Sequence, residues 1–423
     1  MSDTGVPARR SAVYLLDQIL GEGRLMSELT GSGALDKLPV DDRARAARLA
    51  TDTLRGMERA DRLLQKHLSK YPPLTVRNVL RVGTVELCTG AAAHGVVNAM
   101  VELVSKHPRL SHLKGLTNAV LRKVAADGPD AWQNLRAPRL PKWLRGPLVQ
   151  AWGADAMVAM EIAHFNGAPL DLTARDDPQA VATATGGTLL PNGSVRIRDA
   201  GQVSSMPGFA EGAWWVQDVA AAMPVQILAP KPGEKVLDLC AAPGGKTMQL
   251  AAAGAQVTAL DDSAGRMTRV EENLSRTGLK AELVVTDALS AKGQYDAVLL
   301  DAPCSATGTI RRHPDLPQAK DGSEFGALID LQEQLIDHAW TLLKPGGRLV
   351  FCTCSLLPDE GEVQVDEALI RHTDMETDRH ALDRPGIDPD WQTTEGGLRL
   401  RPDFWADKGG MDGFYMACLR KSA

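Results

Sequence analysis

Two cysteines and one aspartate stand where they could carry out covalent catalysis. Asp301 and Cys304 lie in the segment DAPCSATG directly after a short apolar run, and Cys354 lies in FCTCS directly after another. Both runs have the length of buried strands, so the three side chains are expected at the carboxyl ends of adjacent strands. Because an ionised thiol is a strong nucleophile, the set predicts covalent chemistry assisted by a carboxyl group.

Methylation of carbon 5 of a cytosine is a reaction that needs such a set. This carbon is a poor nucleophile toward a methyl sulfonium, but addition of a thiolate to C6 makes the ring an enamine whose C5 can attack. A base then removes the C5 proton and the thiolate leaves, while an acid near N3 donates a hydrogen bond. A carboxyl group can be that acid if burial raises its pKa. Asp301, Cys304 and Cys354 supply the acid, the nucleophile and the group for the elimination, and the chemistry alone does not divide the last two roles.

An earlier segment, CAAPGGK at 240–246, could bind a ligand through its backbone. Its glycine pair follows an apolar run and opens a helix, which lets the chain approach a ligand and offers unpaired N–H groups. It has neither the GxGxxG spacing nor that of a Walker loop. Asp261 ends the next run, where a carboxylate suits the two hydroxyls of an adenosine ribose, although the neighbouring Asp262 could compete for that role. Asp287, after the third run, is placed to reach the adenine side of the same crevice.

Each of these features also has a plainer interpretation. A glycine pair can be only a tight turn, an aspartate can be solvated, and a cysteine can be a small buried hydrophobe. We adopt this last interpretation for Cys88, Cys352 and Cys418, and expect backbone contact at Cys240. We expect no metal, because the cysteines lack CxxC spacing and a second pair. His313, in RRHPD, fits a loop facing phosphate or a turn with a solvated histidine, and is left outside the catalytic set.

The elements around these residues indicate a parallel sheet. Short apolar runs recur at 235–239, 257–260, 283–285, 297–300 and 348–351. Segments of helical length separate them, and strands alternating with helices are typical of βαβ units with right-handed connections. We therefore predict a Rossmann-like, doubly wound α/β domain over residues 213–423.

The apolar residues of the N-terminal part of the chain have helical periodicity from about 7 to 124. Val97, Met100, Val101 and Val104 repeat at the spacing of one helix face, and a similar stripe lies within 116–124. Gly128-Pro129 is expected to close the last helix. Residues 1–135 are therefore predicted to be an all-α domain.

The region 136–212 has mixed helix and strand patterns and is rich in turns. Pro138, Pro141 and Pro147 interrupt its regular elements. Residues 143–164 look helical, whereas 170–174 and 194–198 look like short strands. We predict a small α/β subdomain here.

Charge is distributed unevenly along the chain. The net charge of −6 argues mildly against a nucleic-acid partner, because affinity for a phosphate backbone comes from lysine and arginine. Residues 1–130 nevertheless carry +5 and the remainder −11. A basic N-terminal part joined to an acidic remainder of the chain fits an RNA-docking module on an enzyme. Six arginines crowd one predicted helix, either as a solvated face or as an RNA-binding face: Arg43, Arg45, Arg48, Arg55, Arg59 and Arg62.

Length and composition indicate an ordinary globular protein of two or three domains. The chain has 423 residues, of which 44% are hydrophobic and 24% charged. No apolar run approaches the roughly 20 residues of a membrane span, and the N-terminus lacks a hydrophobic signal segment. Six scattered cysteines do not form a disulfide scaffold. We therefore expect a cytoplasmic protein with no membrane association.

The chain resembles the bacterial RsmB/Sun family of ribosomal RNA cytosine-C5 methyltransferases in four segments: CAAPGGKT (240–247), DAPCSATGTIRRHPD (301–315), LKPGGRLVFCTCS (343–355) and MDGFYMACLRK (411–421). These segments are also similar to the wider RNA 5-methylcytosine methyltransferase group, which includes the eukaryotic NSUN enzymes. The segments at 96–106 and 116–124 resemble the NusB-type helical RNA-binding domain. The likeness covers nearly the whole chain apart from the middle region.

The resemblance implies a division of roles between the cysteines. In RNA enzymes of this type the TCS cysteine, here Cys354, is the nucleophile, and the PC cysteine, here Cys304, assists release of the product. In DNA cytosine-C5 methyltransferases the PC cysteine attacks, so the two assignments are opposed and testable. The family's S-adenosylmethionine contacts carry over to the following residues: Cys240, Ala241, Ala242, Pro243, Gly244, Gly245, Lys246, Asp261, Asp287 and Asp301.

The resemblance also implies the partner and the domain roles. Residues 1–135 would be a NusB-like RNA-binding domain, 136–212 an RNA-facing subdomain and 213–423 a class I methyltransferase domain. The expected substrate is RNA, in particular 16S ribosomal RNA, and nothing in the sequence demands more than a monomer. The alternative hypothesis is a catalytically inactive RNA-binding protein of transcription or ribosome assembly. The intact Asp301, Cys304 and Cys354 argue against it. A DNA enzyme is less favoured, because no target-recognition domain follows the catalytic core.

Overall fold

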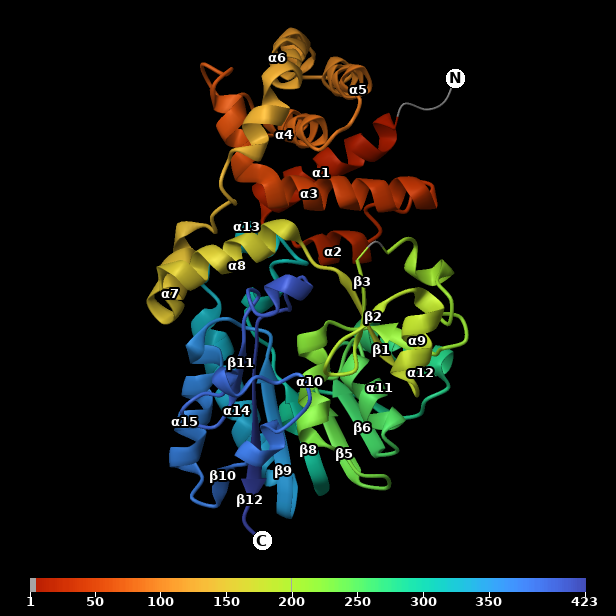
Figure 1. The fold of residues 1–423 in the computed structure, drawn as a ribbon, viewed down its shortest axis with the longest axis vertical. Helices are drawn as coiled ribbons and strands as arrows, with labels where there is room; N and C mark the ends of the chain where they lie inside the picture. Colours follow the sequence, from red (N-terminus) through yellow and green to blue (C-terminus); the bar gives the residue numbers. More distant parts are fainter. Residues whose placement is uncertain (1–4, 199) are drawn as a thin grey trace. The chain divides into compact units, whose positions relative to one another are not determined.

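The computed structural model describes residues 5–198 and 200–423, which form two compact units (Figure 1). Unit 1 comprises Met1–Gly167 and Ile310–Asp321, and unit 2 comprises Ala168–Thr309 and Gly322–Ala423. Each unit is described by itself. Residues 136–167, expected in a middle subdomain, lie within unit 1. The three-part division with boundaries at 135 and 212 stays a prediction.

Unit 1 is built of helices, as the periodicity of the N-terminal part predicts. They are α1 (Val6–Glu22), α2 (Met26–Gly31), α3 (Val40–Gln65), α4 (Leu74–Cys88), α5 (Ala93–Ser105), α6 (Lys114–Gln133), α7 (Lys142–Trp152), α8 (Ala154–Asn166) and the short α13 (Leu316–Ala319). The main core consists of apolar residues mostly from α1–α6, including Leu16, Leu54, Leu80, Met100 and Leu121. Helical stripes with the i, i+3, i+4 spacing thus meet in one interior.

The expectation that Gly128-Pro129 closes the last helix is wrong. Helix α6 continues to Gln133 with Pro129 inside it. Trp132, beyond the proline, is buried against Leu63 and Val85, so tertiary packing holds the final turn in place. Pro147 likewise lies inside α7 rather than between elements. Helix propensity is a local preference that such packing routinely overrides.

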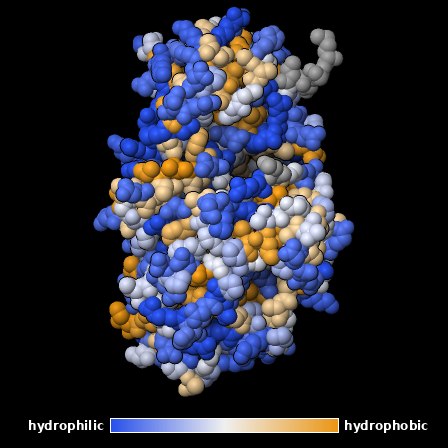
Figure 2. Space-filling view, viewed as in Figure 1, coloured by the Kyte–Doolittle hydropathy of each residue, from blue (hydrophilic) through white to orange (hydrophobic). Residues whose placement is uncertain are grey.

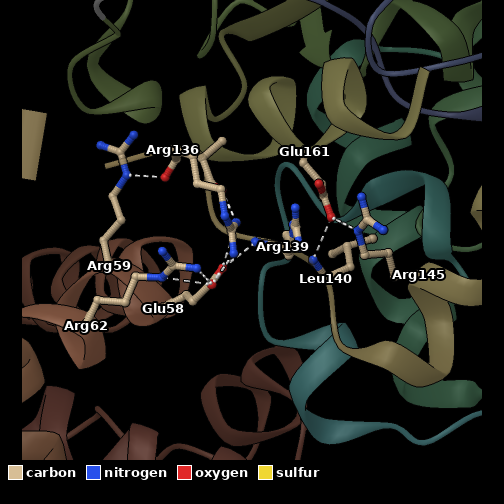
Figure 3. Close-up of polar contacts among 9 residues, drawn as sticks. Glu58, Arg59, Arg62, Arg136, Arg139, Leu140, Arg145 and Glu161 are labelled. Carbon is tan, nitrogen blue, oxygen red and sulfur yellow. Dashed lines mark hydrogen bonds and ion pairs between the residues drawn. The ribbon is translucent and has the colours of Figure 1, made fainter. Parts of the chain in front are cut away.

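Carboxylates anchor the connection from α6 to α7 (Figure 3). Glu58 of α3 accepts hydrogen bonds from the Arg136 side chain and from the Arg139 backbone N–H. Glu161 of α8 accepts from the Leu140 backbone N–H and from the Arg145 side chain. This irregular segment is therefore held on both sides by charge-assisted bonds, which are stronger than neutral ones.

The segment Ile310–Asp321 of unit 1 follows directly after the cysteine loop that contains Cys304. The Asp315 carboxylate accepts the backbone N–H of Met26, the first residue of α2, at 2.8 Å. Arg55 of α3 donates to the carbonyl of Arg311 at 3.0 Å. The RRHPD motif is thus part of the helical unit, and His313, left outside the catalytic set, lies within it.

Unit 2 contains a small antiparallel sheet in the order β2-β3-β1-β4. Its elements are β1 (Leu170–Ala174), α9 (Pro178–Thr185), β2 (Thr188–Leu189), β3 (Val195–Ile197) and β4 (Trp214–Val216). The expected strand at 170–174 is confirmed, and the one at 194–198 is confirmed with shorter bounds. Leu172, Val181 and Trp214 pack in its core. Strand β4 extends the sheet beyond the predicted boundary at 212.

The second sheet of unit 2 has the order β10-β12-β9-β8-β5-β6-β7, with β11 paired to β12. Its strands are β5 (Lys235–Leu239), β6 (Gln256–Asp261), β7 (Glu282–Val285), β8 (Tyr295–Asp301), β9 (Leu343–Thr353), β10 (Met375–Thr377), β11 (Leu398–Leu400) and β12 (Phe414–Lys421). All five predicted strands are present, and β5 to β9 pair in parallel. Figure 1 lets the reader follow β9, β8, β5 and β6 across the sheet.

Helices cover both faces of this sheet. Strand residues such as Val236, Leu299 and Val350 pack with α10 (Val219–Leu228) and α11 (Gly245–Ala252). Their neighbours Leu237, Leu300 and Leu349 face the opposite side, in a core that includes α14 (Phe325–Thr341) and α15 (Glu362–Arg371). Alternating side chains thus enter two cores, as expected for a doubly wound sheet. The predicted fold class is confirmed.

Hydrophilic residues cover most of the face shown in Figure 2, and hydrophobic ones gather there only in small groups. Within residues 5–198 and 200–423, no helix is both long and apolar enough to cross a membrane. The largest fully buried side chains, among them Trp214, Trp215 and Phe351, lie in the interior instead.

Candidate active site

The loop between β5 and α11 has the backbone freedom that its sequence predicts. Cys240 and Gly244 both have positive φ, of 62° and 96°, and the peptide bond between Ala242 and Pro243 is cis. A Cβ on Gly244 would lie 3.0 Å from the side chain of Val270, so the close approach of α12 (Ala264–Thr277) favours glycine. The chain therefore turns sharply and presents the start of α11 at the carboxyl end of the sheet.

Asp261, at the end of β6, fixes this loop. Its buried carboxylate accepts the backbone N–H of Ala242 at 3.1 Å and that of Ser263 at 3.1 Å. Arg266 of α12 donates to the same carboxylate at 2.9 Å and to the carbonyl of Ala242 at 3.0 Å. The neighbouring Asp262 is exposed. Of the two acids, Asp261 is the one that contacts the loop.

Asp287 lies after β7, the strand that pairs with β6. It is exposed, and its carboxylate accepts the backbone N–H of Leu289 at 2.8 Å, which caps a short 3-10 helix. Asp261 and Asp287 thus stand at the carboxyl ends of neighbouring parallel strands, where such sheets bind ligands.

Asp301, at the end of β8, is bound by an ion pair to the loop 240–246, which the sequence predicts to bind the cofactor and which is called the cofactor loop below. The ammonium of Lys246 lies 2.6 Å from its Oδ2 atom, and the Cys352 thiol lies 3.5 Å from its Oδ1 atom. Burial is the largest single influence and lowers the pKa of Lys246, but the charge and hydrogen bond of Asp301, together with the nearby thiols of Cys352 and Cys354, hold the pKa above its ordinary value. Lys246 therefore keeps its proton beside the half-buried carboxylate.

Asp238, the last residue but one of β5, is a buried carboxyl group beneath this site. Its Oδ2 atom accepts the hydroxyl of Thr247 at 2.6 Å, whereas its buried Oδ1 atom has no hydrogen-bond partner in the described chain. Burial raises the pKa of Asp238 to about 7; the Thr247 bond opposes the rise and the nearby Asp301 adds to it. Such an acceptor at the cofactor loop suits a ligand with hydrogen-bond donors.

The two candidate catalytic thiols are neighbours. The Sγ atoms of Cys304 and Cys354 are 3.5 Å apart, because β8 and β9 pair in parallel and both cysteines follow the ends of these strands. Both residues are half-buried. The contact with the Cys354 thiol, and then burial, raise the pKa of Cys304 well above that of an ordinary thiol.

The remaining cysteines lie in packed surroundings. Cys352 and Cys418 are buried, and burial raises the pKa of Cys418 and of the half-buried Cys88 to about 12. Burial also raises the pKa of Cys240 in the cofactor loop. Within the described ranges, no group of three or more histidine, cysteine or acidic side chains could hold a metal ion.

The structure brings most of the sequence-predicted residues to one edge of the sheet of unit 2. Lys246 and Asp301 touch, the two cysteines touch, and Asp261 holds the loop that begins at Cys240. The sequence did not indicate three participants: Asp238, Arg266, and Glu360, whose buried carboxylate accepts the backbone N–H of Ser305 at 2.8 Å. The carboxyl-end position of Asp238 was a usable signal, whereas the contacts of Glu360 depend on residues far away in the chain.

Two family models match the chain. The model described as 16S rRNA methyltransferase RsmB/F matches residues 225–420, and the NusB family model matches residues 6–126. The first match covers the large sheet of unit 2 and all the candidate residues named above. The second covers helices of unit 1.

Curated relatives are similar over nearly their full length. The chain is 34% identical to a protein of Erwinia tasmaniensis named Ribosomal RNA small subunit methyltransferase B, over 97% of each chain. It is 36% identical to a protein of the same name from Pseudomonas putida, over 99% of each chain. Among solved structures, a methyltransferase homolog protein from Pyrococcus horikoshii is 28% identical. That match has a TM-score of 0.53 and covers 65% of this chain and 93% of the other.

Proposed function

Because the chain belongs to the RsmB/F family of 16S ribosomal RNA methyltransferases, we propose that it transfers a methyl group from S-adenosylmethionine to carbon 5 of a cytosine in small-subunit ribosomal RNA. The observation that carries this reaction is the pair of thiols 3.5 Å apart beside Asp301. Methylation at a pyrimidine carbon needs one thiol that adds to the ring and a second group that assists the elimination, and this pair can supply both.

The residues proposed to hold S-adenosylmethionine are those of the loop 240–246 together with Asp261, Asp287 and Asp301. They fit the group: two glycines leave the backbone open, and Asp238 has a buried oxygen without a partner. Asp261 and Asp287 lie at strand ends suited to the ribose and the adenine. When bound, this donor supplies an electrophilic methyl group.

Cys354 is the proposed nucleophile. Its thiolate adds to C6 of the cytosine, which gives C5 the electron density that the methyl transfer requires. Asp301 faces the N3 edge of the ring as the proposed hydrogen-bonding acid, and the Lys246 ammonium, which keeps its proton, holds it in place. Cys304 assists the last stage, in which the C5 proton is removed and the bond between Cys354 and C6 breaks.

The target cytosine must leave its base stack to reach Cys354. A cytosine in a loop or an irregular junction is therefore the proposed target, recognised through shape, backbone contacts and splayed bases. The NusB-like helices of unit 1 are the proposed RNA-docking module. We propose a cytoplasmic monomer. The inactive RNA-binding protein considered as an alternative is not favoured, because the relatives are methyltransferases and the reactive residues are present.

The test compares wild type, Cys354→Ala and Cys304→Ala with transcribed small-subunit ribosomal RNA and labelled S-adenosylmethionine. Wild type should transfer label to RNA, and Cys304→Ala should accumulate a covalent protein–RNA adduct on denaturing gels. Cys354→Ala should give neither adduct nor product. An adduct that survives loss of Cys354 and vanishes with loss of Cys304 would invert the roles. Activity of wild type on duplex DNA but not on RNA would reject the function.

A further inference from the structure

One buried carboxylate, that of Glu360, contacts both loops that carry the candidate catalytic cysteines. Glu360 ends the short 3-10 helix Pro358–Glu360 and is fully buried. Its Oε1 atom accepts the backbone N–H of Ser305 at 2.8 Å, and its Oε2 atom accepts the Ser305 hydroxyl at 2.5 Å. The Ser355 hydroxyl donates to the same Oε2 atom at 2.5 Å. Ser305 and Ser355 directly follow Cys304 and Cys354.

The residues that precede the two cysteines are held by the backbone of Glu360 and by the side chain of Gln332. Thr353, before Cys354, donates its hydroxyl to the backbone carbonyl of Glu360 at 2.7 Å. Pro303, before Cys304, has its carbonyl bound by the side-chain amide of Gln332 at 2.8 Å, and this amide also donates to Oε1 of Glu360 at 3.1 Å. The residues on each side of Cys304 are therefore bound through the Glu360 carboxylate and the Gln332 amide. Of those beside Cys354, Ser355 bonds the carboxylate and Thr353 bonds the backbone carbonyl of Glu360.

We propose that Glu360 is a positioning residue, which holds the Cys304 and Cys354 thiols in contact across the ends of β8 and β9. The inference rests on the proposed function and deepens it, since neither hydroxyl–carboxylate bond touches the reacting atoms. A buried carboxylate is costly unless its lone pairs are satisfied, and four donors satisfy this one. In the described chain no cation forms an ion pair with Glu360, so hydrogen bonds from the two loops are what hold it.

Glu360 affects the thiol pair through its negative charge as well as through its hydrogen bonds. The contact with Cys354 and burial are the largest causes that raise the pKa of Cys304. The negative charge of Glu360 raises it further. The titratable groups near the pair include Cys354 after β9, Glu360 on its 3-10 helix, and Lys246 of α11 with Asp301 of β8. Cys352 of β9 contacts Asp301, and Arg399 of β11 donates to the carbonyl of Ser355. Removal of the Glu360 charge should therefore make Cys304 ionise at lower pH. A role in packing alone would not have this effect.

The experiment compares Glu360→Gln with Glu395→Gln in the full chain. Glu395 is a matched control, because it is also buried in unit 2 and accepts the Tyr415 hydroxyl at 2.6 Å without contacting a cysteine loop. Glu360→Gln should lower kcat by about 10²-fold, the order expected when a reacting group is displaced by about 1 Å. The KM for RNA and the Kd for S-adenosylmethionine should change by less than about twofold. Glu395→Gln should keep wild-type kcat.

A second arm uses no RNA and no S-adenosylmethionine. The rate at which iodoacetamide alkylates Cys304, followed by mass spectrometry between pH 6 and pH 10, should shift to lower pH in Glu360→Gln only. This arm remains informative if wild type transfers no methyl group, which would reject the proposed function but not the positioning of the thiols. Thermal unfolding shows whether each variant is folded.

Three outcomes overturn the proposal. They are wild-type kcat in Glu360→Gln, an equal loss of kcat in both variants, and an alkylation profile that does not move. If Glu360→Gln does not fold, Ser305→Ala replaces it, because this change removes one donor to Oε2 and leaves the carboxylate in place. It should lower kcat at unchanged KM and increase the fraction of trapped RNA adduct; wild-type values of both would reject the positioning role.

Discussion

The Nζ atom of Lys246 lies 2.6 Å from the Oδ2 atom of Asp301, which joins the cofactor loop to the aspartate beside the cysteines. The pair exists because β5 and β8 are neighbours in the sheet, so the first turn of α11 faces the end of β8. Lys246 also lies over the ring of Phe414, with Nζ 5.1 Å from the ring centre. A buried ammonium with these two partners is a fixed charge at the candidate active site.

Substitution of Lys246 by methionine should therefore reduce methyl transfer while the fold is retained. Methionine preserves most of the side-chain volume but leaves Asp301 without its cation, and loss of a general acid–base partner costs roughly 10²-fold or more in kcat. Single-turnover methylation of ribosomal RNA measures the effect. Lys292→Met, at an exposed position of unit 2, is the control and should keep wild-type activity. Equal rates in the two variants would remove Lys246 from the catalytic machinery.

Gly308, in the loop after Cys304, should not tolerate a side chain. A Cβ there would lie 1.9 Å from the carbonyl oxygen of Gly413 and 2.9 Å from that of Cys354. Its backbone N–H also donates to the Cys354 carbonyl at 2.9 Å. Gly308→Ala is expected to lower the free energy of unfolding by about 3 kcal/mol and to lower kcat, since the loop must move away from Cys354. Urea unfolding measures the first effect.

Gly326→Ala is the matched control for this experiment. Gly326 lies in α14, and a Cβ there would meet nothing within 4 Å in the described structure. Alanine should be neutral or slightly stabilising at such a helical position. A Gly308→Ala protein as stable and as active as Gly326→Ala would mean that the loop adapts without cost.

Local patterns predicted the strands and the positions of the cysteines at their ends. The run 235–239 matches β5, and the expected adjacency of the strands before Cys304 and Cys354 is confirmed by the pairing of β8 with β9. The catalytic roles remain predictions. Side-chain partners far apart in the chain were not predictable: Lys246 meets Asp301 across 55 residues, and Glu360 meets Ser305 across 55. Periodicity reports which face of an element is buried, but not which distant polar group it meets there.

The buried carboxyl of Asp238 should make stability depend on pH. Its pKa is raised from the ordinary value of 3.8 to about 7, chiefly by burial. A group whose pKa is higher in the folded state stabilises the fold below its unfolded pKa, and this contribution is lost as pH rises through the folded value. Asp238→Asn stays neutral throughout. The Tm of the variant relative to wild type should therefore rise between about pH 4 and pH 7 and then level off.

Calorimetry of both proteins at pH 5 and pH 8, without ligand, measures this difference. Groups that titrate identically in the two proteins cancel in the comparison, and Thr247 can still donate its hydroxyl to the asparagine carbonyl. A Tm difference that is the same at both pH values would mean that Asp238 is already ionised at pH 5 and that its burial is compensated by bound water.

The arginine-rich helix α3 should separate into structural and RNA-binding residues. Arg59 donates to the carbonyls of Trp132, Leu135 and Arg136, and its guanidinium lies 4.1 Å from the ring centre of Phe165 (Figure 3 shows the bond to Arg136). Trp132 lies in the last turn of α6, and Leu135 and Arg136 follow the helix, so Arg59 holds the chain where α6 ends. Arg48, by contrast, is exposed. The two interpretations of this helix as a solvated face or an RNA face therefore do not apply to every arginine on it.

Arg59→Ala should lower the free energy of unfolding by about 3 kcal/mol, because several bonds to a charged donor and a cation–π contact are lost together. Arg48→Ala should leave stability unchanged and weaken RNA binding, with the slope of log affinity against log salt reduced by about 1 if one phosphate contact is lost. Affinity for S-adenosylmethionine should not change in Arg48→Ala. Urea unfolding and RNA titrations at several salt concentrations measure both effects. Unchanged RNA affinity and salt slope in Arg48→Ala would exclude this part of α3 from the RNA-docking surface, because no internal bond of Arg48 could mask the loss of a phosphate contact.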